Sequence, residues 1–84
     1  MNISFTENAW EDYLYWQNMD RKIVKKINGL VKEIKRNPFT GSGRPEPLKY
    51  DLAGKWSRRI TEEHRLVYQV EEDNILVYTC RYHY

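Results

Sequence analysis

The apolar residues between positions 23 and 34 recur with the period of an α-helix, and this pattern constrains the fold more than any other part of the chain. They stand at positions i, i+4, i+7, i+8 and i+11, which are Ile23, Ile27, Leu30, Val31 and Ile34. Asn37 and Pro38 end the predicted helix, because proline disfavours a helical conformation in the residue before it and has no amide hydrogen. One face of this helix must therefore pack against the rest of the chain.

A further helix is predicted just before it, from about residue 7 to residue 17. Thr6 is a suitable N-cap, and acidic residues in the first turns complement the helix dipole. The connector, residues 18–20, is so short that the two helices should form an antiparallel hairpin. Residues at helical spacing, with one more aromatic residue beside them, are interpreted as core packing: Trp10, Tyr13, Leu14, Gln17 and Trp16.

Runs of β-branched and aromatic residues predict the strands of one sheet. A short strand is expected at residues 3–5, and others at residues 48–52, 56–60, 65–70 and 75–80, separated by turns short enough for hairpins. The predicted fold class is α+β, with an antiparallel two-helix hairpin on one face of a mainly antiparallel sheet of four to five strands. With 84 residues, the chain is expected to form a single domain, residues 1–84, whose other sheet face is open.

Cysteine, histidine and hydropathy patterns exclude several protein classes. A single cysteine, Cys80, cannot form a disulfide within the chain, and with only His64 and His83 beside it no zinc ligand set is expected. We therefore expect no metal and no cofactor, and interpret Cys80 as a buried residue of the last strand. No signal peptide and no segment long enough to span a bilayer are expected, so the cytoplasm is the predicted compartment.

The distribution of charge is more informative than the net charge of +2. Residues 21–36 contain seven lysines and arginines and only one acidic residue, Glu33, whereas acidic residues cluster in segments 7–12 and 71–73. The molecule should therefore have a basic side. This side is either an ordinary solvated helix face or a functional surface that binds a polyanion.

Two segments contain side chains suited to catalysis. The loop at residues 38–47 contains three prolines, and Pro45 and Pro47 flank Glu46, which biases this residue toward an extended conformation on a stiff segment. The last four residues are Arg81, Tyr82, His83 and Tyr84. If the last strand continued through them, Arg81 and His83 would share one side, opposite Tyr82 and Tyr84.

Strand alternation suggests how these segments could meet. Leu66, Tyr68 and Val70 should face the helices, which leaves Arg65 on the open face. There Arg65 could lie near His83, and Arg59, one strand away, could join them. Tyr82 is interpreted as a packed strand residue, and His64 as a turn residue beside two acids.

Glu46, Arg65 and His83 together suit metal-independent phosphodiester transfer by a ribose 2′-hydroxyl. A carboxylate can take the proton of the hydroxyl, an imidazole can donate one to the leaving oxygen, and an arginine can bind the charged phosphoryl group. Simpler interpretations stay open for all three residues. His83 could be an inert surface histidine, Arg65 could pair with Glu62 or Glu63, and Glu46 could be a solvated loop residue.

Long ungapped blocks of the sequence resemble the YoeB family of the RelE-like bacterial toxin superfamily. These blocks cover residues 11–17, 21–28, 45–49, 56–68 and 80–84. The resemblance implies a RelE-like microbial RNase fold. It also implies a ribosome-dependent endoribonuclease that cuts messenger RNA at the A-site codon, leaving a 2′,3′-cyclic phosphate and a 5′-hydroxyl.

The resemblance also implies a role for each residue of the candidate site. Glu46 would be the general base and His83 the general acid, while Arg65 would stabilise the charge of the phosphorane and Tyr84 would help to hold the substrate. Lys49 and Arg59 would position the phosphate. Glu63 would orient Arg65, and Arg81 would contact RNA.

Partners are implied by the same resemblance. They are a YefM-type antitoxin, the 70S ribosome with messenger RNA in its A site, and a second copy of the toxin. DNA would be contacted only indirectly, through the antitoxin complex. No membrane partner is expected. The basic helix would bind ribosomal RNA. Two non-catalytic alternatives remain: a translation inhibitor that only occupies the ribosome, and an RNA- or DNA-binding module, although the chain lacks RNP-type aromatic residues and a helix-turn-helix pattern.

Overall fold

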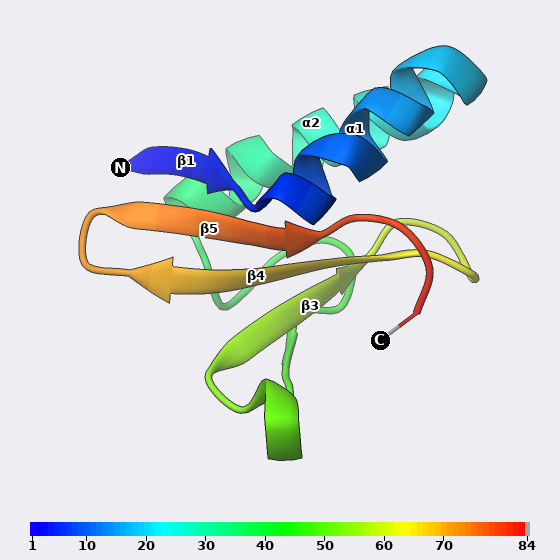
Figure 1. Ribbon diagram of the computed structural model, residues 1–84. Helices are drawn as coiled ribbons and strands as arrows, with labels where there is room; N and C mark the ends of the chain where they lie inside the picture. The colour runs from blue at the N-terminus through cyan, green and yellow to red at the C-terminus, as the bar shows by residue number, and fades with distance from the viewer. Residues whose placement is uncertain (84) are drawn as a thin grey trace.

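The computed structural model describes residues 1–83, in which two helices cover one face of a five-stranded sheet (Figure 1). The strand order is β1-β5-β4-β3-β2; β1 is parallel to β5 and the other neighbours are antiparallel. The predicted α+β class is therefore confirmed. Along the chain the elements are β1 (Asn2–Phe5), α1 (Glu7–Met19), α2 (Arg21–Arg36), β2 (Glu46–Pro47), the 3₁₀ helix η1 (Tyr50–Leu52), β3 (Lys55–Arg59), β4 (Arg65–Glu71) and β5 (Asn74–Thr79).

The helix hairpin turns on a single residue, Asp20. Its backbone N–H donates to the carbonyl of Trp16 at 2.9 Å and ends α1, while its carboxylate accepts from the amide of Lys22 at 3.0 Å and caps α2. The helix α1 is therefore two residues longer than predicted, because Asn18 and Met19 belong to it. At its other end Thr6 is the N-cap, as predicted, and accepts from the amide of Ala9 at 3.0 Å.

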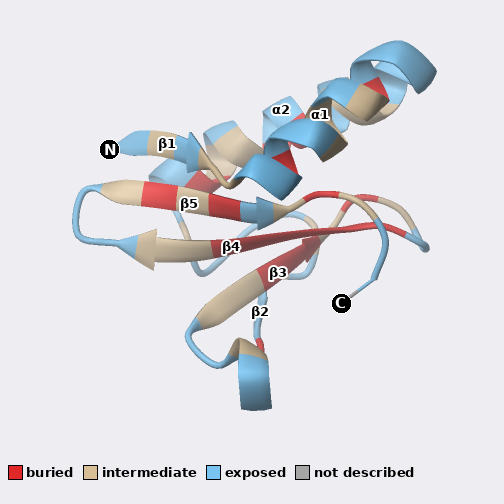
Figure 2. Cartoon of the chain, in the orientation of Figure 1, coloured by how far each residue is buried: buried red, intermediate tan, exposed pale blue. Residues whose placement is uncertain are grey.

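The core lies between the helices and the sheet, and the buried residues line the middle strands in Figure 2. On α2, Ile27, Leu30 and Ile34 are buried, as the apolar period predicts. On α1 the prediction is partly wrong, because Trp10 and Leu14 are 48% and 39% exposed, and the buried residues are Ala9 and Trp16. Trp16 can enter the core because its indole N–H donates to the carbonyl of Cys80 at 2.9 Å.

A fully buried arginine, Arg58, joins β3 to the loop that follows α2. Its side chain has no exposed surface, and all three of its nitrogens donate hydrogen bonds. Alternation along β3 places it on the helix side of the sheet, opposite Arg59. The acceptors are Tyr68 Oη, Glu33 Oε1 and the carbonyl oxygens of Ser42, Asn37 and Thr40.

The segment predicted as a strand at residues 48–52 is not one. The strand β2 consists of Glu46 and Pro47, in the segment expected to be irregular. Leu48 still donates its amide to the carbonyl of Lys55 in β3 at 2.9 Å, and the chain then enters η1. Tyr50 has a φ of 57°, which is incompatible with an extended strand. The amide of Leu52 donates to the carbonyl of Lys49 at 3.1 Å, in the i to i+3 pattern of a 3₁₀ turn.

No helix within residues 1–83 is long and apolar enough to cross a membrane. The two helices instead place their apolar faces on the sheet, where α2 contributes its buried stripe to the common core.

Replacing Arg58 by methionine should lower the free energy of unfolding by about 3–5 kcal/mol. The substitution leaves the Glu33 carboxylate and the three carbonyl oxygens that accept hydrogen bonds from Arg58 without their donor. The matched control is Arg21→Met at an exposed position of α2, for which we expect a change within about 0.5 kcal/mol. Urea unfolding followed by tryptophan fluorescence measures both. Equal stability of the two variants would show that the buried guanidinium does not hold the loop.

The stability of the protein should fall in acid partly through Glu33. Hydrogen bonds from Ser42, and the charge of Arg58, hold the pKa of Glu33 below its ordinary value of 4.5. A lowered pKa in the folded state means that Glu33 contributes stability above the unfolded value and loses it as the pH falls through the folded value. We expect Glu33→Gln to be less stable than the wild type at neutral pH, with a shallower loss of stability below pH 4.5, measured by urea unfolding at a series of pH values. Parallel profiles would contradict this origin of the acid sensitivity.

Candidate active site

A small pocket on the sheet face opposite the helices is lined by four of the eight predicted site residues. Its volume is about 100 Å³. Glu46, Arg59, Arg65 and His83 all line it, together with Gly43, Arg44 and Ser57. These residues come from the loop before β2, from β2, β3 and β4, and from the tail after β5. Segments that are far apart in the sequence therefore converge on one hollow.

Glu46 lies in β2, where its partner in register is Ser57 of β3. The loop before it is fixed by Gly43, whose carbonyl accepts from the amide of Arg59 at 2.6 Å. Gly43 has a φ of 80°, and a Cβ atom there would lie 3.1 Å from the carbonyl oxygen of Arg59. Only glycine allows this close approach without strain. The position of Glu46 thus depends on two sets of backbone contacts, those of the preceding loop with Arg59 and those of β2 with β3.

Arg59 and Arg65 are opposite each other in register on β3 and β4. Arg65 is only 9% exposed, and its Nη1 donates to the carbonyls of Thr61, Glu62 and His64 at 2.6, 3.1 and 3.1 Å. Carbonyl oxygens of its own turn thus solvate the guanidinium. The salt bridges of Glu62 and Glu63 are with Arg59 and His64, so the alternative in which Arg65 pairs with one of these acids is wrong. Glu62 instead lies 3.4 Å from Arg59 Nη1. The Nε atom of Arg59 is buried and has no hydrogen-bond partner within residues 1–83.

The C-terminal tail does not continue the last strand, which corrects the predicted alternation through His83. The strand β5 ends at Thr79, after a bulge at which Val67 pairs with Thr79 and Tyr68 with Val77. Tyr82 has a φ of 65° and is 54% exposed, so it is not a packed strand residue. The tail folds back onto the start of β4, which brings His83 to the pocket. Cys80 is buried as predicted, but it follows the strand.

The other predicted residues lie around this pocket. Lys49 lines a neighbouring hollow that it shares with Glu46. Glu63 lies with its carboxylate 3.6 Å from Nε2 of His64. Arg81 stacks its guanidinium over the rings of Tyr15, at 3.5 Å, and Tyr82, at 4.5 Å. Tyr84 lies outside the described residues.

Sequence reasoning missed three residues of this region. Ser57 could have been found, because strand alternation places it on the same face as Arg59. Arg44 has a positive φ of 52°, and no sequence pattern indicates that it lines the pocket. His64 was interpreted as a turn residue, but it is buried, and its Nδ1 accepts the amide N–H of Tyr82 at 2.7 Å.

Neither a cluster of metal-ligating side chains nor a reactive thiol is found in the described part of the chain. Among residues 1–83 no group of three or more histidine, cysteine, aspartate or glutamate side chains could hold a metal ion. Burial raises the pKa of the Cys80 thiol to about 12, with a smaller contribution from the charge of Asp12. Cys80 is therefore a neutral thiol at physiological pH and not a nucleophile.

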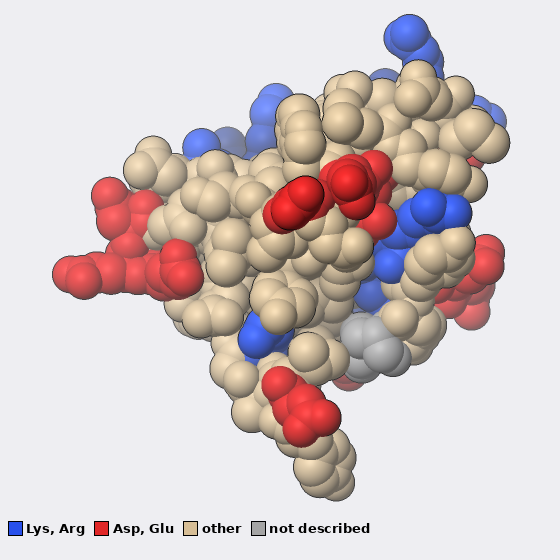
Figure 3. Space-filling view, in the orientation of Figure 1, with Lys and Arg blue, Asp and Glu red and all other residues tan. Residues whose placement is uncertain are grey.

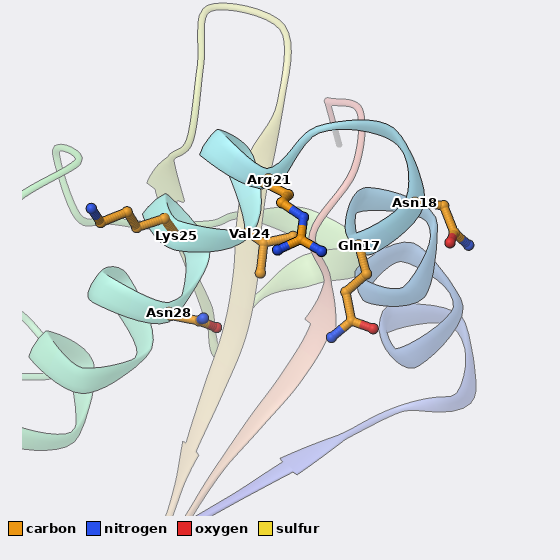
Figure 4. A pocket seen from close by; sticks show the side chains of 6 residues that line it. All are labelled: Gln17, Asn18, Arg21, Val24, Lys25 and Asn28. Carbon is orange, nitrogen blue, oxygen red and sulfur yellow. The ribbon is translucent and has the colours of Figure 1, made fainter.

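The basic side lies on α2, which carries seven lysines and arginines, and Figure 3 shows blue side chains along the upper edge of the molecule, whereas red ones cluster over α1 and at the β4–β5 turn. A hollow of about 450 Å³ lies between the two helices, with Gln17 and Asn18 on one side and Arg21, Val24, Lys25 and Asn28 on the other. Figure 4 shows the guanidinium of Arg21 extending toward Gln17, while Lys25 points outward. The predicted basic side therefore includes a polar hollow on the helix hairpin.

Comparison with known proteins gives one consistent result. Residues 5–84 match the family described as YoeB-like toxin of bacterial type II toxin-antitoxin system. Toxin YoeB of Escherichia coli (strain K12) is 61% identical over 84 residues, which cover 100% of both chains. The solved structure of the YoeB/ParE toxin from Agrobacterium tumefaciens superposes with a TM-score of 0.98 at 51% identity and covers 100% of both chains.

YoeB from Staphylococcus aureus is similar too, and it has been solved in two states. The YoeB dimer matches with a TM-score of 0.94 at 53% identity, covering 100% of this chain and 98% of that chain. The YoeB-YefM complex matches with a TM-score of 0.92 at 52% identity and the same coverage. Because the family match covers almost the whole chain and its relatives agree with it in sequence and fold, the chain belongs to the YoeB-like toxins of bacterial type II toxin-antitoxin systems.

Proposed function

We propose that the chain is a ribosome-dependent endoribonuclease that cuts messenger RNA at the A-site codon and thereby inhibits translation. The observation that carries this proposal is the convergence of Glu46, Arg65 and His83 on one pocket from three separate segments. A carboxylate, an imidazole and a guanidinium can supply the base, the acid and the charge stabilisation that transfer of a phosphodiester to a neighbouring hydroxyl requires.

In the proposed reaction Glu46 removes the proton of the ribose 2′-hydroxyl. The 2′-oxygen then forms a bond to the adjacent phosphorus, the bond from phosphorus to the 5′-oxygen breaks, and His83 donates a proton to that oxygen. The products are a 2′,3′-cyclic phosphate and a 5′-hydroxyl. No metal takes part in this scheme, since the two side chains transfer both protons.

The two arginines are proposed to bind the phosphate as its charge grows. Arg65 is held by three carbonyl oxygens and so presents its guanidinium in a fixed orientation. Arg59 adds a second cation, because it is opposite Arg65 in register and lines the same pocket. Lys49, in the neighbouring hollow, and Tyr84 are proposed to hold the flanking RNA.

The size of the pocket supports a substrate that lies across the surface. A volume of about 100 Å³ is well below the roughly 300–1,000 Å³ of sites that enclose a whole small molecule. The pocket is therefore suited to the scissile phosphate and its sugar edge, while the rest of the codon stays outside. This agrees with a requirement for the ribosome, which would present the message and hold its bases.

The basic surface of α2 is proposed to bind ribosomal RNA. Phosphate contacts from lysine and arginine position a protein on a nucleic acid without reading its sequence. Arg21 and Lys25 belong to this surface and lie on the hairpin that covers the opposite face of the sheet from the pocket. Such an arrangement would leave the pocket open to the message. A requirement for the ribosome would place the protein in the cytoplasm.

We also propose a YefM-type antitoxin and a second copy of the chain as protein partners, because Staphylococcus aureus YoeB has been solved with YefM and as a dimer. The basic side offers a surface for an acidic antitoxin segment. DNA would be contacted only through the antitoxin complex.

Glu46→Gln and His83→Ala should each lower the rate of message cleavage by roughly 10²–10⁴-fold, because each removes one proton-transfer group. The matched control is Glu72→Gln, which changes an exposed carboxylate in the β4–β5 turn and should cut at the wild-type rate. Primer extension on a ribosome-bound message locates and quantifies the cuts. Undiminished cutting by both site variants would reject the assigned roles. Growth arrest with an intact message in the Glu46 and His83 double variant would favour an inhibitor that only occupies the ribosome.

Lys25→Ala should weaken ribosome engagement without slowing the chemical step. We expect KM for ribosomes to rise and kcat to stay unchanged, because Lys25 is exposed on the helix face away from the pocket. The slope of log affinity for ribosomes against log salt concentration should decrease by about one, the contribution of a single phosphate contact. A lower kcat at constant KM would place Lys25 in a different role.

A further inference from the structure

The tail after β5 is held by its backbone at two residues, Cys80 and Tyr82. The amide of Cys80 donates to Asp12 Oδ2 at 3.1 Å, and its carbonyl accepts from the indole of Trp16 at 2.9 Å. The amide of Tyr82 donates to His64 Nδ1 at 2.7 Å, and its carbonyl accepts from the amide of Arg65 at 3.0 Å. Each of these two residues therefore has both of its backbone groups bonded, and the second of them directly precedes His83.

His64 differs from the other residues that hold the tail, because it contacts both the tail that carries His83 and the side chain of Arg65. Its side chain binds the tail through Nδ1, while its carbonyl accepts from Nη1 of Arg65 at 3.1 Å. The ring is buried and packs edge-on against Trp16, with the ring centroids 4.7 Å apart. Because Nδ1 is the acceptor, the ring proton of the neutral imidazole must be on Nε2, which lies 3.6 Å from a carboxylate oxygen of Glu63.

The backbone of Tyr82 needs this support. Its φ of 65° is a left-handed conformation that residues other than glycine rarely adopt, so it persists only where surrounding contacts hold it. Loss of the hydrogen bond at its amide would allow the residue to relax toward an extended conformation. Relaxation at Tyr82 rotates the chain just before His83 and moves the imidazole away from the pocket.

We propose that His64 is a positioning residue that holds the general acid in place: its Nδ1 fixes Tyr82 in the left-handed conformation that directs His83 into the pocket. This proposal rests on the proposed function, because it takes His83 as the proton donor. The effect is expected on the chemical step, since a misplacement of about 1 Å in a reacting group can lower a rate roughly 10²-fold. Binding of the ribosome through the helix surface should be unaffected.

Two amide substitutions distinguish positioning from packing. In His64→Asn the amide oxygen occupies the place of Nδ1 and can still accept from Tyr82, whereas in His64→Gln it occupies the place of Nε2 and cannot. We expect His64→Asn to keep most of the wild-type kcat. His64→Gln and His64→Leu should lose roughly 10–100-fold in kcat at nearly constant KM for ribosomes. If His64→Gln and His64→Leu cut as fast as the wild type, or if all three variants lose activity equally, the proposal is overturned.

A second measurement tests the contact without any cleavage assay. The amide of Tyr82 should exchange slowly with solvent in the wild type and in His64→Asn, and at least about tenfold faster in His64→Gln and His64→Leu. The amides in the middle of β4 should keep their protection, whereas the amide of Arg65, which donates to the carbonyl of Tyr82, should lose protection together with Tyr82. Exchange followed by NMR on each folded variant reports this directly. Equal protection of Tyr82 in all variants would reject the anchoring role. If the wild type fails to cut any ribosome-bound message, the proposed function fails, while the exchange data still decide whether His64 holds the tail.

Discussion

The buried guanidinium of Arg58 is the interaction on which the rest of the structure depends. A charge without solvent contact is costly unless its hydrogen-bonding groups are satisfied and a counter-charge is near. Arg58 meets both conditions, because Glu33 lies 3.4 Å away and three carbonyl oxygens of the loop after α2 accept hydrogen bonds from its guanidinium. If the loop left the sheet, the buried charge of Arg58 would lose the groups that accept its hydrogen bonds. Since this loop leads into β2, the same interaction fixes the approach to Glu46.

The candidate site is assembled from parts that are each held by a different physical device. The loop before β2 is tied down from the helix side of the sheet, Arg65 is oriented by carbonyl oxygens of its own turn, and the tail is bonded through its backbone. None of these devices is a side-chain contact between the reacting groups themselves. Geometry supplied by the scaffold is what catalysis by proximity requires, because the groups lose little freedom when the substrate arrives.

Local patterns in the sequence predicted the elements that depend on local physics. The apolar period of α2, the Thr6 cap and the proline end signal require only neighbouring residues, and all three are confirmed. The errors fall at a tight turn and at a bulge, which interrupt a strand without changing the residue types that favour one. The segment after Pro47 has strand-forming residues but turns at Tyr50, and the bulge before Thr79 cannot be read from alternation. Glu46, Arg65 and His83 could be chosen by their chemistry, whereas the hydrogen bond that directs the tail joins residues 18 apart and has no sequence signature.

The parallel pairing of the first and last strands has a kinetic consequence. Thr6 donates its hydroxyl proton to the carbonyl of Tyr78, 72 residues later, and β1 pairs with β5 from Asn2 to Phe5. Contacts between such distant positions form late in folding, since the chain between them must first be ordered. During synthesis the first strand stays without its partner until Val77 has left the exit tunnel. The first strand to be synthesised is therefore the last of the five to gain its partner in the sheet.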